Sequence, residues 1–226
     1  MDFAQALSTR RSCRAYLPTP VPRKVIARVL ALASRSASNS NSQPWHVHVV
    51  TGAAKRRLTA ELLQAHAAGD RSPEYDYQPS PEEWPEPFLA RRRHFGDTLY
   101  SQALGLARDN LAGRLDHHRR NYDFFGAPVG IVLTVSRGPL GGALVDAGLF
   151  LQSLMLAARA FGLDTCPQAS LIDFSPVLRR TLGIPSDQLI VCGLSLGHAD
   201  LAHPSTRCRT PREPVSAFTT FHDTED

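Results

Sequence analysis

The sequence predicts a single domain of the α/β or α+β class, because helical and strand-like segments alternate along a chain of ordinary globular composition. Its 226 residues are 42% hydrophobic and 20% charged, which is enough apolar material for one substantial core. Three short apolar segments, at 46–50, 128–135 and 188–196, have the length and β-branched content of strands. No segment has the composition of a linker, so we expect residues 1–226 to form one domain.

The first third of the chain predicts three helices. Residues 3–8 indicate a short helix that leads into a basic segment, and three prolines then impose an extended turn. From residue 23, apolar side chains recur at helical spacing as far as Ala33. The polar run 34–42 follows, and Gln43-Pro44-Trp45 stops the helix before the first strand. Another helix is expected at 53–68.

The middle of the chain predicts an insert at about 69–127 that covers the site as a lid. Residues 69–87 combine five prolines with three aromatic residues, which is typical of an irregular loop packed on the body. We expect one long helix over 87–118 and an aromatic turn over 121–127. The later segment 143–161 is apolar almost all round, which places that helix in a core or a subunit interface.

The last third predicts a loop or short strand at 165–171, an amphipathic helix at 174–182 and an extended, basic tail after Gly197. We expect the end of this tail to reach across to a partner. No apolar run approaches the roughly 18 residues of a membrane-spanning helix. The N-terminus lacks an apolar signal core, and the four cysteines form no metal or disulfide pattern. The sequence therefore predicts a reduced, soluble, cytoplasmic protein.

The formal net charge of +4 comes almost entirely from arginine, since Lys24 and Lys55 are the only lysines. Guanidinium groups bind phosphates through paired hydrogen bonds, so the bias is consistent with anionic ligands. A nucleic-acid surface is the alternative. The clusters at 91–93 and 117–120 lack the interleaved aromatic residues of a single-strand binder, which favours solvated helix faces.

Three polar segments are candidates for chemistry. In an extended segment Arg10, Ser12 and Arg14 share one face and could converge on a phosphate, although a basic surface turn is the alternative. The polar side chains of the run 38–43 can form hydrogen bonds with the edge of a polar heterocycle. The alternative is a turn with a helix cap. The third segment is the basic tail 207–212. The glycines at 138–142 have the wrong spacing for a dinucleotide or P-loop fingerprint.

Together these segments resemble the nitroreductase family. The matches, in order, are Arg10-x-Ser12-x-Arg14-x-Tyr16; Asn41-Ser42-Gln43-Pro44-Trp45 followed by a strand; Gly162-Leu163-Asp164-Thr165-Cys166-Pro167; the strand end Leu194-Ser195-Leu196-Gly197-His198; and Arg209-Thr210-Pro211. They cover about residues 5–220. The segment 121–128 is similar to one in the subgroup that includes nitrobenzoate reductases.

The resemblance implies an α+β fold with a central, mainly antiparallel sheet flanked by helices, in an interlocked homodimer. It also implies one FMN per subunit at the dimer interface, with NADH or NADPH as a transient electron donor and a small-molecule acceptor. The implied cofactor-binding residues are Arg10, Arg11, Ser12, Arg14, Ser38, Asn39, Ser40, Asn41, Gln43, Pro167, Gln168, Ala169, Ser170, Arg207 and Arg209. Some would come from the partner subunit. Many members carry Glu-Gly or Gly-Gly where this chain has Ala169-Ser170.

The function implied is hydride transfer from NAD(P)H through flavin N5 to nitroaromatic or quinone-like acceptors, with ping-pong kinetics and no dedicated catalytic side chain. Aromatic residues expected to stack on the acceptor are Tyr75, Tyr77, Trp84, Phe124 and Phe125, for which core packing is the alternative. Rival functions are flavin fragmentation, reductive dehalogenation, flavin carriage without turnover, and binding of nucleic acid. The preferred interpretation includes neither a nucleic acid nor a membrane as a partner.

Overall fold

The computed structural model describes residues 1–77, 80, 83–138 and 140–222. At its centre is a four-stranded sheet in the order β1-β2-β4-β3, in which every neighbouring pair is antiparallel. The strands are β1 (Trp45–Thr51), β2 (Val129–Ser136), β3 (Asp164–Gln168) and β4 (Gln188–Gly197). The three predicted strands are confirmed, and the segment left open between loop and strand contributes β3. The predicted α+β class is confirmed.

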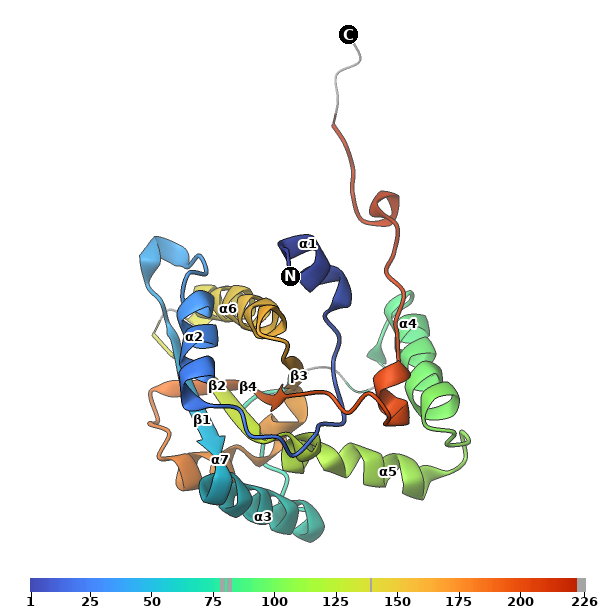
Figure 1. Cartoon of the computed structure of the whole chain (residues 1–226), viewed down its shortest axis with the longest axis horizontal. Coiled ribbons are helices and arrows are strands. Elements are labelled where there is room, and N and C mark those ends of the chain that lie inside the picture. The colour runs from blue at the N-terminus through green and yellow to red at the C-terminus, as the bar shows by residue number, and fades with distance from the viewer. Residues whose placement is uncertain (78–79, 81–82, 139, 223–226) are drawn as a thin grey trace.

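Two apolar clusters cover the two faces of the sheet, because successive strand residues point to opposite sides. Ile131 and Leu133 of β2 pack with α2 (Arg23–Ala33) and α6 (Leu140–Ala160). Val132, which lies between them in sequence, faces the other cluster, with α3 (Gly52–Ala68) and α7 (Ser175–Leu182). Helices therefore enclose the sheet from both sides (Figure 1).

The single long helix predicted over 87–118 is wrong. The structure has α4 (Phe88–Gly96), a π-helical turn η3 (Asp97–Ala103) and then a separate α5 (Leu111–Arg119). Gly105 interrupts the helix with a left-handed φ of 67°, a conformation that glycine adopts at little cost. Asn110 then begins α5 by accepting a hydrogen bond of 2.9 Å from the amide of Gly113, which is a normal N-cap.

Helix α6 is apolar and 21 residues long. By length and composition it could cross a membrane, so the expectation that no segment approaches that limit is wrong. One side of it packs inside the fold, where the ring of Phe150 stacks on Trp45 with 4.9 Å between centroids. Val145 and Leu149 are exposed on the other side. A core helix of this kind satisfies the same criteria as a membrane span.

The first part of the predicted lid is attached to the body. The Glu74 carboxylate pairs with Arg137 and Arg179, and the Tyr75 hydroxyl donates to the Val191 carbonyl at 3.2 Å. The amide of Ser72 donates to the Asp173 carbonyl. These contacts hold residues 72–75 beside β4 and α7. Short 3-10 helices connect these elements: η1 (Asn39–Asn41), η4 (Arg120–Gly126), η5 (Ala169–Phe174), η6 (Pro204–Arg207) and η7 (Val215–Ala217).

Both chain ends lie on one side of the molecule. Helix α1 (Phe3–Thr9) lies beside α6, and the C-terminal segment passes α4 and then leaves the body (Figure 1). This arrangement brings the two basic segments of the sequence into the same region.

Candidate functional site

The N-terminal basic segment extends the edge of the sheet. The amide of Cys13 donates to the Thr165 carbonyl at 2.9 Å, and Ser12 forms a parallel bridge with Thr165 of β3. Further along, Tyr16 forms an antiparallel bridge with Ala199, just beyond β4. The extended backbone buries Cys13 completely and leaves Ser12 and Arg14, on either side of it, to face a cavity.

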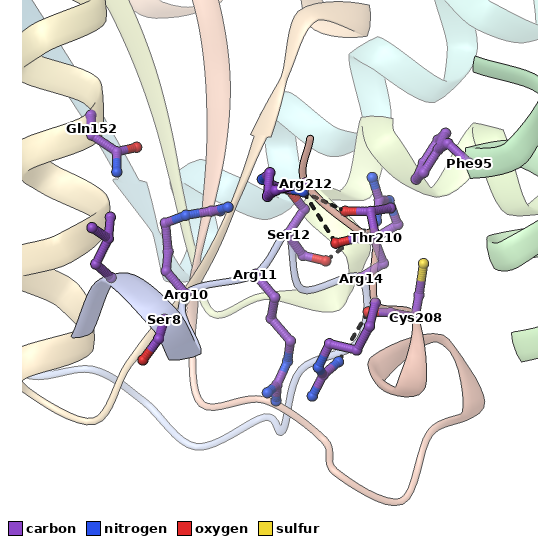
Figure 2. Close-up of a pocket in the computed structure, with 12 residues that line it drawn as sticks. Ser8, Arg10, Arg11, Ser12, Arg14, Phe95, Gln152, Cys208, Thr210 and Arg212 are labelled. Atoms are coloured by element: carbon purple, nitrogen blue, oxygen red, sulfur yellow. Dashed lines mark hydrogen bonds between the residues drawn. The ribbon is translucent and has the colours of Figure 1, made fainter. Parts of the chain in front are cut away.

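This cavity has a volume of about 580 Å³ and lies between the two ends of the chain. Figure 2 shows side chains from both chain ends around it: Ser8 and Arg10 lie toward Gln152 of α6, whereas Arg14 lies among the tail residues, toward Phe95 of α4. The N-terminal lining is Leu7, Ser8, Arg10, Arg11, Ser12 and Arg14, and the tail contributes Cys208, Arg209, Thr210 and Arg212. The predicted convergence of residues 10–14 with the basic tail is thus present within one subunit.

The cavity carries a concentrated positive charge. Five of its lining residues are arginines and none is acidic. Burial, and then the nearby charge of Arg212, lower the pKa of Arg10. Arg11 has an acidic neighbour outside the cavity, because Asp164 lies 3.9 Å from its guanidinium and also pairs with Arg159 at 3.1 Å. An anion bound here would relieve the repulsion among the remaining guanidinium groups.

Most hydrogen-bond donors of these arginines are unused by the part of the chain that the structure describes. Arg14 donates to the Ser12 carbonyl, and Arg209 and Arg212 donate to nearby oxygens of the tail, in each case through Nη1 alone. A guanidinium has five N–H donors. The Arg11 Nε is buried and has no partner among the described residues. The site is therefore suited to an anion with several acceptor oxygens, such as a phosphate.

Two details of the predicted binding set differ from the structure. Arg207 is exposed at the end of η6 and does not line the cavity, whereas Arg212 does. Pro204–Arg207 forms the short helix η6, and it is Arg209 and Arg212, beyond this helix, that line the cavity. The sequence also does not predict Phe95 and Gln152 as lining residues, because helical periodicity does not show which position of a helix meets a distant chain end.

The polar run lies elsewhere in the subunit. The backbone amide of Asn39 donates to both carboxylate oxygens of Asp146 on α6, at 3.2 Å, and Asn39 to Gln43 are exposed. Ser40, Asn41 and Gln43 have left-handed φ values of 49°, 54° and 47°, which are strained for residues other than glycine. None of the residues Ser38–Gln43 lines the arginine cavity of its own subunit.

The segment 167–170 joins β3 to η5, and its glutamine is used internally. The Gln168 Oε1 accepts a 2.6 Å hydrogen bond from the Ser195 hydroxyl, and its Nε2 donates to the Asn121 carbonyl at 2.7 Å. Gln168 therefore positions the segment, and its buried side chain is not available to a ligand. The Ala169 and Ser170 side chains line a small cavity of about 150 Å³ together with Tyr75 and Tyr77.

The acceptor-stacking prediction fails for the two phenylalanines. Phe124 and Phe125 are 0% and 2% exposed and belong to the core under α3, so the core-packing alternative holds for them. Tyr75 is half-buried beside β4, and Trp84 is covered by the Arg92 guanidinium, 5.1 Å from the ring centroid. Neither Tyr75 nor Trp84 lines the arginine cavity.

Known proteins resemble this chain in both sequence and fold. Residues 7–198 match the nitroreductase family. A 4-nitrobenzoate reductase of Nocardioides sp. (strain LMS-CY) is 50% identical over 220 residues, which cover 97% of this chain and 89% of that protein. The crystal structure of an FMN and NADPH-dependent nitroreductase, NfnB of Sphigopyxis sp. strain HMH, superimposes with a TM-score of 0.94 at 35% identity, covering 99% of this chain and all of that one. NfnB of Mycobacterium smegmatis, an FMN-dependent nitroreductase in complex with NADPH, gives a TM-score of 0.91 at 35% identity, with 98% and 100% coverage.

Proposed function

The chain belongs to the nitroreductase family, and on that premise we propose that it is an FMN-dependent enzyme that reduces small nitroaromatic or quinone-like acceptors with NAD(P)H. The observation that carries the proposal is the arginine cavity, where two distant segments of the chain meet. Relatives with similarity over nearly the full length are named 4-nitrobenzoate reductase and FMN and NADPH-dependent nitroreductase, which supports the same reaction class.

The cavity fits the phosphate end of FMN. A phosphate monoester carries about two negative charges and several acceptor oxygens at neutral pH. The cavity offers guanidinium donors from Arg10, Arg14, Arg209 and Arg212, with the Ser12 hydroxyl between them, and has no acidic side chain in its lining. These residues would hold the phosphate. Gln168 would act indirectly, by fixing the backbone of residues 167–170.

When bound, FMN supplies the two-electron chemistry between the nicotinamide and the acceptor. The chain's own contribution is to bind and orient the cofactor and to place positive charge beside the reduced, anionic ring. The proposal therefore assigns no protein nucleophile or general base. Because donor and acceptor would use the same face of one cofactor in turn, we expect ping-pong kinetics.

We also propose that the active unit is a homodimer. The strained, exposed turn at Ser38–Gln43 belongs to the predicted cofactor-binding set but lies outside the arginine cavity of its own subunit. A second copy would bring this turn to the site. Apolar side chains that need cover support the same assembly: Val145 on α6 and Phe3 on α1 are 66% and 71% exposed, and Phe218 and Phe221 of the departing tail are 71% and 73% exposed.

The proposed function is tested by an anaerobic titration of the purified protein with NADPH and with NADH, followed by a panel of nitroaromatic and quinone acceptors. We expect a yellow protein, a bound flavin bleached by at least one nicotinamide, and colour restored by the acceptor. Initial-rate plots at several acceptor concentrations should be parallel. A flavin that neither nucleotide bleaches would identify a flavin carrier, and a colourless protein that binds DNA would reverse the proposal.

A further inference from the structure

A second basic cavity lies on α4, outside the site described above. Its volume is about 530 Å³, and it is lined by Leu89, Arg92, Arg93, Gly96, Asp97, Arg108 and Arg114. Four arginines thus surround one aspartate. In the described part of the chain, none of the four forms an ion pair within 4.0 Å. The described lining therefore has an excess of positive charge, with Asp97 as its one acidic residue.

Packing contacts hold two of these arginines in place. The Arg114 guanidinium lies 4.6 Å from the centroid of the Tyr100 ring, and its Nη1 donates to the Arg108 carbonyl at 3.4 Å. The Arg92 guanidinium lies over Trp84. Such stacking restrains the long side chains before any ligand binds, which reduces the entropy lost on binding. Arg93 and Arg108 are exposed, and within the described residues their guanidinium groups form no ion pair.

The position of the cavity relates it to the first site. Phe95 faces the arginine cavity, whereas the adjacent Gly96 lines this second one. The two sites therefore lie on different sides of α4. With FMN in the first site, a donor that reacts at the flavin would need an extended shape, with an anionic group at its far end, to reach this second cavity. A small nitroaromatic acceptor is too short for this.

We infer that this second cavity binds the 2′-phosphate end of NADPH and makes the enzyme prefer NADPH to NADH. The inference rests on the proposed function, which supplies a nicotinamide donor. A 2′-phosphate is a monoester with about two negative charges. Two charges balance the excess of guanidinium groups in this cavity better than the one charge of a carboxylate would. Arg93 and Arg108 supply its principal free donors, and NADH has no group that would use them.

The test uses the FMN-loaded protein, so that the first arginine cavity is filled, and compares wild type with the double variant Arg93→Ala/Arg108→Ala. Both side chains are exposed, so the fold should be retained. The direct probe is adenosine 2′,5′-bisphosphate, with AMP as the ligand that lacks the 2′-phosphate, measured by calorimetry. We expect wild type to bind the bisphosphate at least tenfold more tightly than AMP, and the double variant to lose that difference.

The kinetic readout is the ratio of KM for NADPH to KM for NADH. It should rise at least tenfold in the double variant with kcat unchanged, and Arg56→Ala, which removes one exposed arginine from α3, should leave it unchanged. Equal binding of the bisphosphate by wild type and double variant, or an equal rise in both KM values, would overturn the inference. A protein that binds the bisphosphate as expected but oxidises neither nucleotide would count against the proposed function instead.

Discussion

The backbone amide of Cys13 donates a 2.9 Å hydrogen bond to the carbonyl oxygen of Thr165. This bond attaches an extended N-terminal segment to the edge strand β3, where the central sheet would otherwise end. It fixes which side chains of residues 10–14 face the arginine cavity. Because β3 leads directly into residues 167–170, the same attachment fixes two parts of the predicted cofactor site relative to each other.

Arg14→Ala should weaken FMN binding. Its guanidinium stacks on Phe95 at 5.2 Å from the ring centroid and has unused donors toward the cavity. One hydrogen bond to a charged group contributes roughly 1.5–3 kcal/mol, so the dissociation constant should rise by about tenfold or more. Fluorescence titration of the apoprotein with FMN measures this. An unchanged dissociation constant would mean that Arg14 does not contact the cofactor.

Arg212→Ala and Arg207→Ala separate the observed site from the predicted one. The two substitutions remove the same charge from the same tail, but only Arg212 lines the cavity. We expect the Arg212 variant to lose FMN affinity by about the amount given for one charged hydrogen bond, and the Arg207 variant to bind as wild type does. The same titration, at two salt concentrations, gives the comparison. If Arg207→Ala lost more FMN affinity than Arg212→Ala, Arg207 would contact the cofactor, for instance in the site of the partner subunit.

Much of the site's position follows from local sequence. Alternating apolar residues predict the strands, and the extended spacing of Arg10, Ser12 and Arg14 places them on one face. The roles of Arg212, Phe95 and Gln152 depend on where the tail and α4 come to lie, which no periodicity records. The break between η3 and α5 was missed because Gly105 and Asn110 stand within an otherwise helical pattern. The burial of Phe124 and Phe125 does not follow from the sequence, since composition alone does not distinguish a buried turn from an exposed lid.

Phe124→Ala should lower stability and leave acceptor preference unchanged. The ring is fully buried and packs against Gly130 of β2 so closely that a Cβ added to this glycine would lie 2.8 Å from it. Removing a buried phenylalanine side chain typically costs about 3–5 kcal/mol. Urea unfolding measures this loss, and Phe88→Ala, at a residue 51% exposed, is the matched control. If a Phe124 variant kept wild-type stability but changed acceptor specificity, this would support a role of Phe124 in stacking on the acceptor.

His117 should make stability depend on pH between about 6.5 and 4. Burial, followed by the positive charges of Arg120, Arg14, His203 and His118, lowers the pKa of His117 to about 4. Its ring packs between Tyr100 and Phe125, and its Nε2 has no partner among the described residues. An unfolded histidine has a pKa near 6.5. Over that interval the unfolded chain binds a proton that the folded chain does not.

The free energy of unfolding should therefore fall as the pH decreases through this interval, and the contribution of His117 should be constant above it. The loss attributable to this residue is roughly 3 kcal/mol between pH 6.5 and 4. His117→Phe retains an aromatic ring without a titrating group, so it should flatten the profile there. His94→Phe, at an exposed position of α4, should leave the slope as in wild type. Urea unfolding at half-unit pH steps measures both variants, and a His117→Phe profile parallel to that of wild type would show that other groups cause the slope.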